Sequence, residues 1–326
     1  MTKKIFLFFF TLILNCLLLT GCRKAPVTFS DTGFYFDTVI TVTLYDNGSQ
    51  EILDRCMNLA AEYENLLSTT VSGSDIWNIN HSRGSYVTVS DETAKLLDSA
   101  IAYSRLSDGL VDPTIGSLSS LWNFGSDSES CLPDDTAIAK ALSHVNYENI
   151  SIKGNQVALT DPEASLDLGF IAKGYIGDQM KAFLEAEGVT SALINLGGNV
   201  VTVGSKPDGS PFRVGIQDPF SQSGTAALVL DLSGKSAVSA GNYERYFEID
   251  GTRYHHILST QNGYPADSGL TQVTIICDES ARADALSTLC FILGYEKAAS
   301  LLENYPEVKA VFITEDGEIS YVNFES

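Results

Sequence analysis

The sequence predicts an α+β fold in which antiparallel sheets pack against helices. Predicted strands outnumber predicted helices, and several consecutive strands are joined by tight-turn dipeptides such as Gly154-Asn155, Asp250-Gly251 and Asp316-Gly317. Such hairpins are typical of antiparallel sheet rather than of a doubly wound parallel sheet. The chain has 326 residues, of which 44% are hydrophobic, and no long Pro-, Gly- or Ser-rich tract divides it. We therefore expect one globular domain over residues 33–326.

Individual elements are predicted from hydrophobic periodicity, N-cap residues and turn residues. The predicted helices begin after Ser49, Ser90 and Pro133 and span residues 171–188, 280–293 and about 298–302. The predicted strands span residues 34–45, 150–153, 156–160, 165–168, 191–196, 200–203, 212–217, 226–232, 245–250, 253–258, 271–277, 308–314 and 319–323.

Residues 1–21 have the three parts of a secretory signal. Lys3 and Lys4 precede an almost entirely apolar segment, which ends in Leu19-Thr20-Gly21-Cys22. A transmembrane anchor is the alternative, but the apolar run is shorter than the roughly 20 residues that a span needs. The last four residues resemble a bacterial lipoprotein box, in which the cysteine is lipidated. We therefore expect Cys22 to be lipidated, a polar linker over residues 22–32, and a location on the extracytoplasmic face of the bacterial cell membrane.

The charge of the chain limits its partners. With 41 acidic and 20 basic side chains its net charge is −21. We expect no nucleic-acid partner, because phosphate backbones are bound by clustered Lys and Arg. A small phosphate-bearing ligand needs only a local cation and is compatible with this charge. Beyond the signal, Cys56, Cys131, Cys277 and Cys290 are expected to be partly buried thiols, although an extracytoplasmic compartment permits a disulfide.

Two oxygens on the helix predicted over residues 280–293 could hold a divalent cation. Asp284 and Thr288 are four residues apart and share a face of that helix, and Ser287 lies near the same face. A carboxylate and a hydroxyl on consecutive turns suit a hard cation such as Mg²⁺, which keeps other positions for water and phosphates. The helix dipole also favours an acidic residue near a helix N-terminus, and for this motif alone that explanation suffices.

A predicted strand, turn and helix start from Leu166 to Tyr175 could bind an anion. Gly169 lets the backbone approach a ligand, the helix N-terminus offers free N–H groups, and Lys173 adds a positive charge. Asp167 could accept from a ligand amide or hydroxyl. A turn aspartate and a solvated lysine explain the segment equally well, because it has no GxGxxG or Walker pattern.

Other motifs are ambiguous alone. Asp112-Pro113-Thr114-Ile115-Gly116 is predicted in a long loop between helices, Gly197-Gly198-Asn199 closes a strand, and Tyr243-Glu244-Arg245 precedes one. His255 and His256 are predicted on a strand, where neighbouring side chains point to opposite faces, so they cannot easily share a metal.

Taken together, these segments resemble the FAD:protein FMN transferase (ApbE) family, from about Phe36 to the C-terminal strands. Seven blocks occur in the family's order: Phe36-Asp37-Thr38, Asp112 to Gly116, Leu166 to Tyr175, Leu193 to Asn199, Gly241 to Arg245, His255-His256-Ile257-Leu258 and Ala283 to Thr288. The resemblance implies a single α+β domain related to the T-fold that binds FAD and Mg²⁺. It also implies transfer of FMN to a Thr or Ser hydroxyl on an extracytoplasmic acceptor with an FMN-binding domain, such as a redox subunit or an electron-transfer lipoprotein, with release of AMP.

The resemblance also assigns site residues. The implied metal ligands are Asp284, Thr288 and the backbone carbonyl of Phe170, with Ser287 where some members add an acidic ligand. The implied FAD contacts are Phe36, Thr70, Leu110, Val111, Asp112, Asp167, Lys173 and Leu258. Lys173 would hold the pyrophosphate, and His256 is the candidate general base.

The residues that depart from the family pattern lie at predicted flavin contacts and not at the predicted metal ligands. Phe36-Asp37-Thr38 stands where many members have Met-Gly-Thr, and Thr70 occupies a position that can be Tyr. Two other functions would use the same features: a Mg²⁺-dependent FAD pyrophosphatase that gives FMN and AMP, and a lipid-anchored flavin-binding receptor. The sequence does not separate transfer from hydrolysis, because the nucleophile is not part of this chain.

Overall fold

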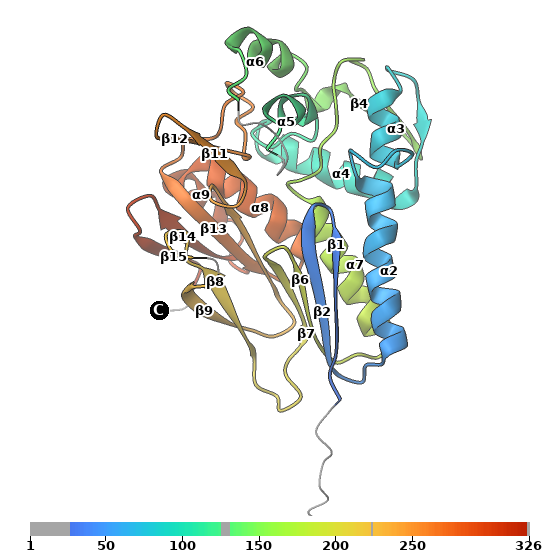
Figure 1. The fold of residues 1–326 in the computed structure, drawn as a ribbon, viewed down its shortest axis with the longest axis vertical. Helices are drawn as coiled ribbons and strands as arrows, with labels where there is room; N and C mark the ends of the chain where they lie inside the picture. The colour runs from blue at the N-terminus through green and yellow to red at the C-terminus, as the bar shows by residue number, and fades with distance from the viewer. Residues whose placement is uncertain (1–26, 125–130, 223, 325–326) are drawn as a thin grey trace, which may run out of the picture.

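The centre of the computed structural model, which describes residues 27–124, 131–222 and 224–324, is an eight-stranded sheet (Figure 1). All neighbouring strands in it are antiparallel, which confirms the predicted α+β class. In spatial order its strands are β1 (Phe29–Tyr35), β2 (Thr38–Asp46), β6 (Ser191–Leu196), β7 (Asn199–Gly204), β10 (Ser236–Gly241), β13 (Leu270–Cys277), β14 (Lys309–Thr314) and β15 (Ile319–Val322).

Three helices pack on one face of this sheet: α2 (Gln50–Leu67), α7 (Ala172–Ala186) and α8 (Ser280–Leu293). They bury the main core of the protein with the strands. Ser49 caps α2, as its Oγ accepts from the amide of Ile52 at 3.2 Å, so the predicted start is confirmed. The other helices are α3 (Asp75–His81), α4 (Asp91–Leu106), α5 (Gly116–Trp122), α6 (Asp135–Leu142), the 3₁₀ turn η1 (Tyr147–Asn149) and α9 (Tyr295–Leu302).

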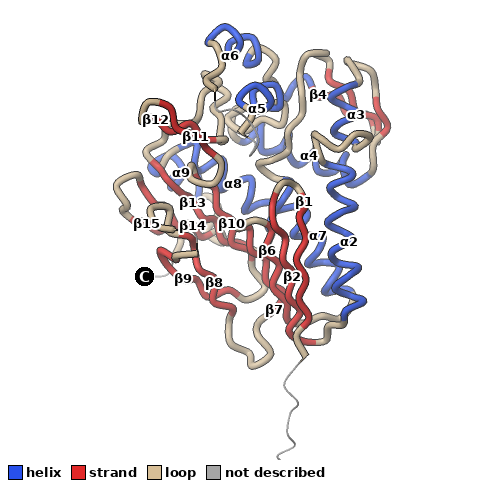
Figure 2. Tube along the Cα trace, viewed as in Figure 1, coloured by secondary structure: helices blue, strands red, loops and turns tan. Residues whose placement is uncertain are grey.

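Three smaller sheets surround the large one (Figure 2). The hairpin of β8 (Phe212–Gln217) and β9 (Ala226–Leu232) covers part of the opposite face, where Phe212 and Leu232 form a second core with Ile276 and Val311. The sheet of β3 (Val87–Thr88), β5 (Gln156–Leu159) and β4 (Ile150–Lys153) lies with α3 to α6 at one end. The hairpin of β11 (Tyr246–Ile249) and β12 (Thr252–His255) stacks its aromatic side chains on Trp122.

The segment predicted as a single strand over residues 34–45 is a hairpin. Phe36 and Asp37 form its turn with φ angles of 53° and 54°. Two consecutive residues with positive φ match the twist of a hairpin, but this turn lacks the Asn-Gly or Asp-Gly pair that usually signals it. Since β1 begins at Phe29, the last residues of the segment predicted as linker belong to the sheet.

Two other predictions about local structure were wrong. Residues 165–168 form no strand but only a bridge between Ser165 and Ile115. His255 is the last residue of β12 and His256 lies beyond it, so the pair is not within one strand. β10 was not predicted, because Ser-Ala-Val-Ser-Ala-Gly has no aromatic residue and one β-branched residue, whereas strands are usually rich in both.

The predicted signal and Cys22 lie outside the described residues. Within the described part of the chain, no helix has both the length and the apolar character that a membrane span requires. The four cysteines found there are free thiols: Cys56, Cys277 and Cys290 are buried, whereas Cys131 is exposed.

Candidate active site

Segments distant in the sequence meet near the middle of the large sheet. β7 pairs with β10 at only two positions, so their ladder stops next to Asn199, the first residue of β7. Asn199 follows the Gly197-Gly198 turn, whose φ angles are 59° and 99°. The amide side chain of Asn199 there meets Asp284 on α8, which in turn contacts Gly174 on α7. The end of the β7–β10 ladder therefore lies beside the N-terminal turns of two helices.

The two helices are held in backbone contact at Gly174. A Cβ atom at this position would lie 2.6 Å from the carbonyl carbon of Ser280 and 2.7 Å from Cα of Ala281, so a larger residue would not fit. One turn later, Asp178 accepts hydrogen bonds from the amides of Ser280 at 2.7 Å and Ala281 at 2.8 Å. These bonds satisfy two of the free N–H groups at the start of α8. The position of α8 along α7 is thus fixed, and Asp284 with it.

Asp284 is a buried carboxylate with two neutral hydrogen-bond donors. Its side chain is 4% exposed, its Oδ2 accepts from the amide of Gly174 at 2.8 Å, and its Oδ1 accepts from Nδ2 of Asn199 at 3.0 Å. Burial raises the pKa of this carboxyl, whereas the nearby charge of Lys173 and the two hydrogen bonds act to lower it. The neutral donors orient both oxygens without neutralising the charge, so the site is suited to a cation.

The carbonyl of Phe170 lies just before α7, whose N-cap is Ile171. The amide of Gly174 is one of the N-terminal amides that have no acceptor within the helix, and it donates to Asp284. The first regular helical bond runs from the amide of Tyr175 to Ile171 at 3.0 Å. The side chain of Phe170 is buried. The Phe170 carbonyl therefore precedes the turn whose amide holds Asp284, and no helical bond of α7 uses it.

The donors on these segments fit a hard divalent cation. Carboxylate, hydroxyl and carbonyl oxygens are the ligands that Mg²⁺ takes. Thr288 is half-buried one turn beyond Asp284, whereas the hydroxyl of Ser287 donates to the Asp284 backbone carbonyl at 2.9 Å. The described residues include no group of three or more His, Cys, Asp or Glu arranged for a metal. A cation at this place would thus depend on mixed oxygen ligands and on its substrate.

Lys173 links the buried carboxylate to two further titratable groups. It lies on the first turn of α7, and its charge lowers the pKa of both Asp284 and Glu244. The protein around Glu244 desolvates its carboxyl and raises its pKa, although the residue reaches the surface beside Gly198. The pKa of His256 lies well below its usual value, first because of burial and then because of the charges of Arg245 and Lys173. Of the two predicted catalytic residues, Lys173 thus acts directly on Asp284, whereas His256 interacts with Lys173.

The loop before α7 is held in place from both sides. On one side, the amide of Asp167 donates to the Pro113 carbonyl at 2.8 Å, and the amide of Gly116 donates to Ser165 at 3.0 Å. On the other, Asn80 of α3 accepts from the amide of Leu166 at 2.7 Å and donates to its carbonyl at 3.0 Å. The Asn80 side chain therefore forms the two hydrogen bonds with the Leu166 backbone that a neighbouring strand would form in a sheet.

The two predicted binding carboxylates on these loops are engaged differently. Asp112 is buried, and it accepts from the amide and hydroxyl of Thr114 at 2.8 and 2.6 Å and from the amide of Tyr147 at 2.8 Å. Both of its oxygens thus hold the loop together. Asp167 is half-buried, and within the described part of the chain its side chain accepts one hydrogen bond, from the amide of Gly169 at 2.8 Å, so the second oxygen is available to a ligand.

The remaining predicted FAD contacts are spread over neighbouring segments. Phe36 lies at the β1–β2 turn, which touches the Gly197-Gly198 turn through Thr38. Thr260 donates to the Gly109 carbonyl at 2.7 Å and so links the segment after Leu258 to the one before Leu110 and Val111. Thr70 is exposed, and among the described residues its hydroxyl bonds to Ser68 and not to the cluster around Asp284.

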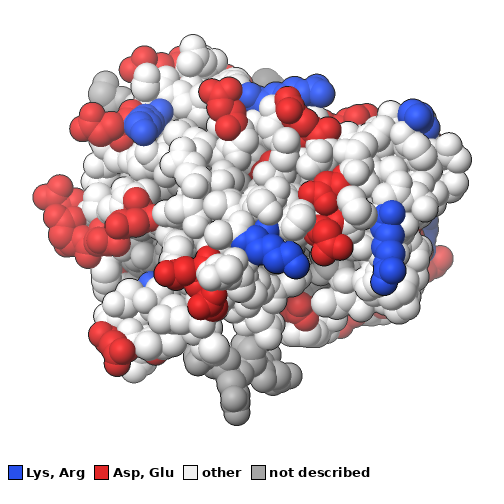
Figure 3. All heavy atoms as spheres, turned by 90° about the horizontal axis from the view of Figure 1, so that it is seen from above, with Lys and Arg blue, Asp and Glu red and all other residues white. Residues whose placement is uncertain are grey.

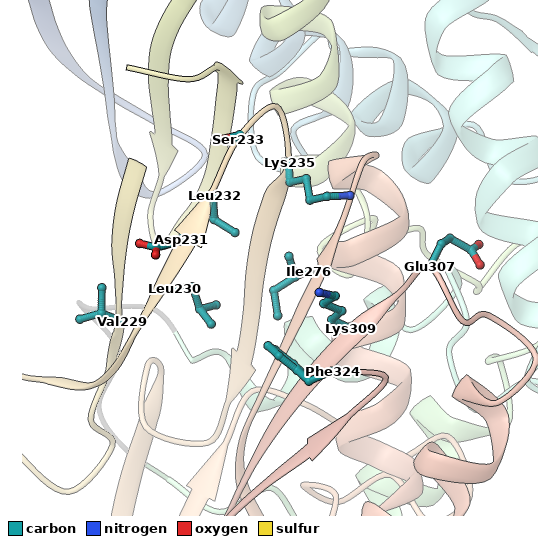
Figure 4. A pocket seen from close by; sticks show the side chains of 10 residues that line it. All are labelled: Val229, Leu230, Asp231, Leu232, Ser233, Lys235, Ile276, Glu307, Lys309 and Phe324. Atoms are coloured by element: carbon teal, nitrogen blue, oxygen red, sulfur yellow. The ribbon is translucent and has the colours of Figure 1, made fainter. Parts of the chain in front are cut away.

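A cavity on the described residues lies away from this site. It has a volume of about 440 Å³ and is formed mainly by β9, β13 and β14 (Figure 4). Leu230, Leu232, Ile276 and Phe324 line it, and Lys235 and Lys309 lie at its edge. No residue of the predicted site contributes to it. A smaller cavity of about 270 Å³ includes Leu110 with side chains of α8 and α9.

The surface charge of the protein is unfavourable for an anionic ligand. On the face seen in Figure 3 acidic side chains form several patches, and Lys and Arg side chains lie scattered between them. With a net charge of −21, this surface repels a pyrophosphate at long range. Lys173 and a cation at Asp284 would offset this repulsion locally.

The fold and the site define an antiparallel α+β protein in which a helix N-terminus and a buried carboxylate suit an anionic ligand with its cation. The profile of the ApbE family matches residues 36–312, and the chain belongs to this family. A Klebsiella pneumoniae FAD:protein FMN transferase is 37% identical over 86% of this chain and 87% of its own length. The Treponema pallidum FAD:protein FMN transferase is 35% identical over 82% and 78%. The crystal structure of the ApbE protein from Thermotoga maritima superimposes with a TM-score of 0.83 at 30% identity, covering 91% of this chain and 97% of that one.

Three residues of the site were not predicted from the sequence. Asn199 and Glu244 lie in segments that the sequence singles out, but no role was assigned to them. Asn80 lies on a short helix that was not predicted at all. A polar residue directly after the Gly-Gly turn was the one available signal for Asn199, whereas a single amide on a short helix gives none.

Proposed function

We propose that this protein transfers FMN from FAD to a Thr or Ser hydroxyl of an acceptor protein outside the cytoplasm, with Mg²⁺ as cofactor. Family membership supports the reaction, since the matched relatives are named FAD:protein FMN transferases. The observation that carries the proposal is the hydrogen bond from the N-terminal amide of Gly174 to Asp284, which fixes the buried carboxylate next to the start of α7 and the preceding Phe170.

The reaction needs positioning and charge compensation rather than covalent chemistry by the protein. The acceptor oxygen forms a bond to the phosphorus on the riboflavin side, and the bond from that phosphorus to the bridging oxygen breaks. The bridging oxygen leaves with AMP, and the hydroxyl proton passes to a base. Asp284, Thr288 and the Phe170 carbonyl would hold Mg²⁺, which supplies charge neutralisation at the pyrophosphate.

The residues around the metal ligands divide the remaining tasks. Lys173 and the first turn of α7 would bind the pyrophosphate, and Asp167 has a free oxygen for a ligand donor. Nδ1 of His256 lies 3.3 Å from the Arg245 carbonyl, which can only accept, so the proton is on Nδ1 and Nε2 carries the lone pair. The lowered pKa keeps this ring neutral at pH 7. His256 can therefore accept the proton of the acceptor hydroxyl through Nε2.

A labelling assay tests the proposal. The purified protein is mixed with FAD, Mg²⁺ and an FMN-binding acceptor domain, and flavin fluorescence is read on a denaturing gel. Labelling of the acceptor, and none when its threonine is changed to valine, is the expected result. AMP and free FMN without labelling would indicate hydrolysis, and intact bound FAD would indicate a receptor.

Two aspartates near the start of α8 provide the variant and its control. Asp284→Ala should abolish labelling, and EDTA should do the same. Asp278→Ala removes an exposed carboxylate that pairs with Lys235 at 2.7 Å, and it should label at the wild-type rate. Wild-type labelling by Asp284→Ala would rule out the cation site.

We also propose that a lipid on Cys22 tethers the protein to the membrane surface, as the Leu-Thr-Gly-Cys sequence indicates. The full chain should then fractionate with membranes and take up a radioactive fatty acid. The Cys22→Ser variant should do neither.

A further inference from the structure

Asn199 has a side chain that the fold satisfies only in part. It is 1% exposed, and its Nδ2 lies 3.0 Å from Oδ1 of Asp284. A carboxylate accepts hydrogen bonds and does not donate them, so the amide must present its nitrogen there. The orientation of the whole side chain is thereby fixed.

The oxygen of the same amide has no partner. Oδ1 of Asn199 is buried and makes no hydrogen bond among the described residues. An unpaired buried polar atom costs about 1–3 kcal/mol, so such atoms are usually satisfied in the functional state of a protein. The missing partner must be a donor or a cation, because Oδ1 can only accept.

An unpaired acceptor and an uncompensated charge therefore occur side by side. Asp284 keeps lone pairs beyond the two used by Gly174 and Asn199, and its charge is not neutralised by these donors. Among the described residues no cationic side chain hydrogen-bonds to either group, although the charge of Lys173 acts on Asp284. A hydrated divalent cation satisfies both groups together, since the metal binds the carboxylate and a metal-bound water donates to the amide oxygen.

We infer that Asn199 belongs to the cation site, where its nitrogen orients Asp284 and its oxygen accepts a hydrogen bond from the hydrated cation or ligates it directly. This inference rests on the cation of the proposed function. It adds a positioning residue from β7 to ligands that come from α7 and α8, and it explains why a buried amide stands where the β7–β10 ladder stops.

Binding of Mn²⁺ alone, followed by the loss of its free electron paramagnetic resonance signal, tests the inference without any turnover. Asn199→Leu keeps the shape of the side chain but removes both polar atoms, and we expect its Mn²⁺ affinity to fall at least tenfold, as for other residues that orient metal ligands. Asn199→Asp keeps the oxygen and replaces the nitrogen by a second carboxylate oxygen, and it should bind Mn²⁺ at least tenfold more tightly than Asn199→Leu. Asn199→Ser, which is too short to reach Asp284, takes the place of the leucine variant if that variant does not fold.

A buried amide on the other face of the sheet is the matched control. Gln272 is fully buried, its Oε1 also lacks a partner, and its strand neighbour Val273 is the residue that packs toward α8. Gln272→Leu should bind Mn²⁺ like the wild type.

The outcomes separate this inference from the proposed function. If the wild type binds Mn²⁺ and Asp284→Ala does not, but Asn199→Leu is folded and binds normally, the role of Asn199 is refuted and the cation site stands. Equal weakness of Asn199→Leu and Asn199→Asp would refute the role of the oxygen. If the wild type itself binds no Mn²⁺, both the inference and the cation of the proposed function are refuted.

Discussion

Replacement of Gly174 by alanine should separate the two helices that carry the site. The new Cβ atom would lie 2.6 Å from the carbonyl carbon of Ser280, whereas ordinary contacts begin at about 3.4 Å. The helices must therefore move apart by about 0.8 Å. The same movement lengthens the 2.8 Å bond from the Gly174 amide to Asp284 to about 3.6 Å, at which it is no longer a hydrogen bond.

The energetic cost has two parts. Overpacking of a close contact costs about 1–3 kcal/mol. The loss of a hydrogen bond to a buried carboxylate adds about 1–3 kcal/mol. We expect the free energy of unfolding of Gly174→Ala to fall by about 2–6 kcal/mol in urea denaturation, and its Mn²⁺ affinity to fall at least tenfold.

A glycine in the β8–β9 hairpin is the control for this experiment. At Gly215 the nearest atom to a new Cβ is Cβ of Ala226 at 3.2 Å, on an exposed part of the hairpin. Gly215→Ala should change the free energy of unfolding by less than about 1 kcal/mol and leave Mn²⁺ affinity unaltered. If Gly174→Ala behaves like this control, the helix contact does not hold the site.

Three further outcomes are expected. Asn80→Ala removes both hydrogen bonds to Leu166, so the free energy of unfolding should fall by about 1–3 kcal/mol and FAD affinity should fall as well; fluorescence titration measures the latter. Burial lowers the pKa of His255 to about 4 from 6.5, so its neutral ring contributes stability above pH 6.5 that is lost as the pH falls toward 4. Between pH 7 and pH 4 the free energy of unfolding, measured by urea denaturation, should therefore fall less in His255→Gln than in the wild type. The difference between the two decreases should reach about 3 kcal/mol. Iodoacetamide should modify Cys131 in the native protein, while the three buried thiols, whose pKa burial raises to about 11 or 12, react only after unfolding, as peptide mass spectrometry would show.

Each of these outcomes has a contrary result. Asn78 lies on the same helix as Asn80, and its side chain donates to the Gly73 carbonyl at 3.0 Å and not to Leu166, so equal loss of FAD affinity in Asn78→Ala would show that Asn80 does not act through the ligand loop. Parallel stability curves for His255→Gln and the wild type would exclude the histidine as a source of acid sensitivity. Modification of a buried cysteine in the native protein would contradict the burial described for it.

Fold class and most elements could be predicted because their signals are local. The helix from Ser280 to Leu293 has the predicted bounds, and Ser49 and Ser90 cap the helices that they were expected to begin. The β1–β2 turn was missed because Phe36 and Asp37 adopt positive φ without a glycine. β10 was missed because a buried central strand of small residues lacks the usual pattern.

The candidate site was predicted in its residue types but not in its geometry. Spacing placed Asp284 and Thr288 on one helical face, and the fold keeps them there. The residue spacing did not indicate that both oxygens of Asp112 accept hydrogen bonds from within the protein. The bond from Tyr147 comes from a separate part of the chain, and Thr114 supplies the other. The same holds for Asn80 and Asn199, whose partners are 86 and 85 residues away.

The bond between Gly174 and Asp284 spans 110 residues, and this has a consequence for the maturation of the protein. Contacts so remote form late, since the entropy of closing a long loop opposes them until most of the chain has condensed. A nascent polypeptide that ends before α8 already contains every predicted flavin contact but lacks the carboxylate. Under the proposed function, cation binding therefore requires the segment from Ser280 onward, about the last seventh of the chain, to have docked on α7.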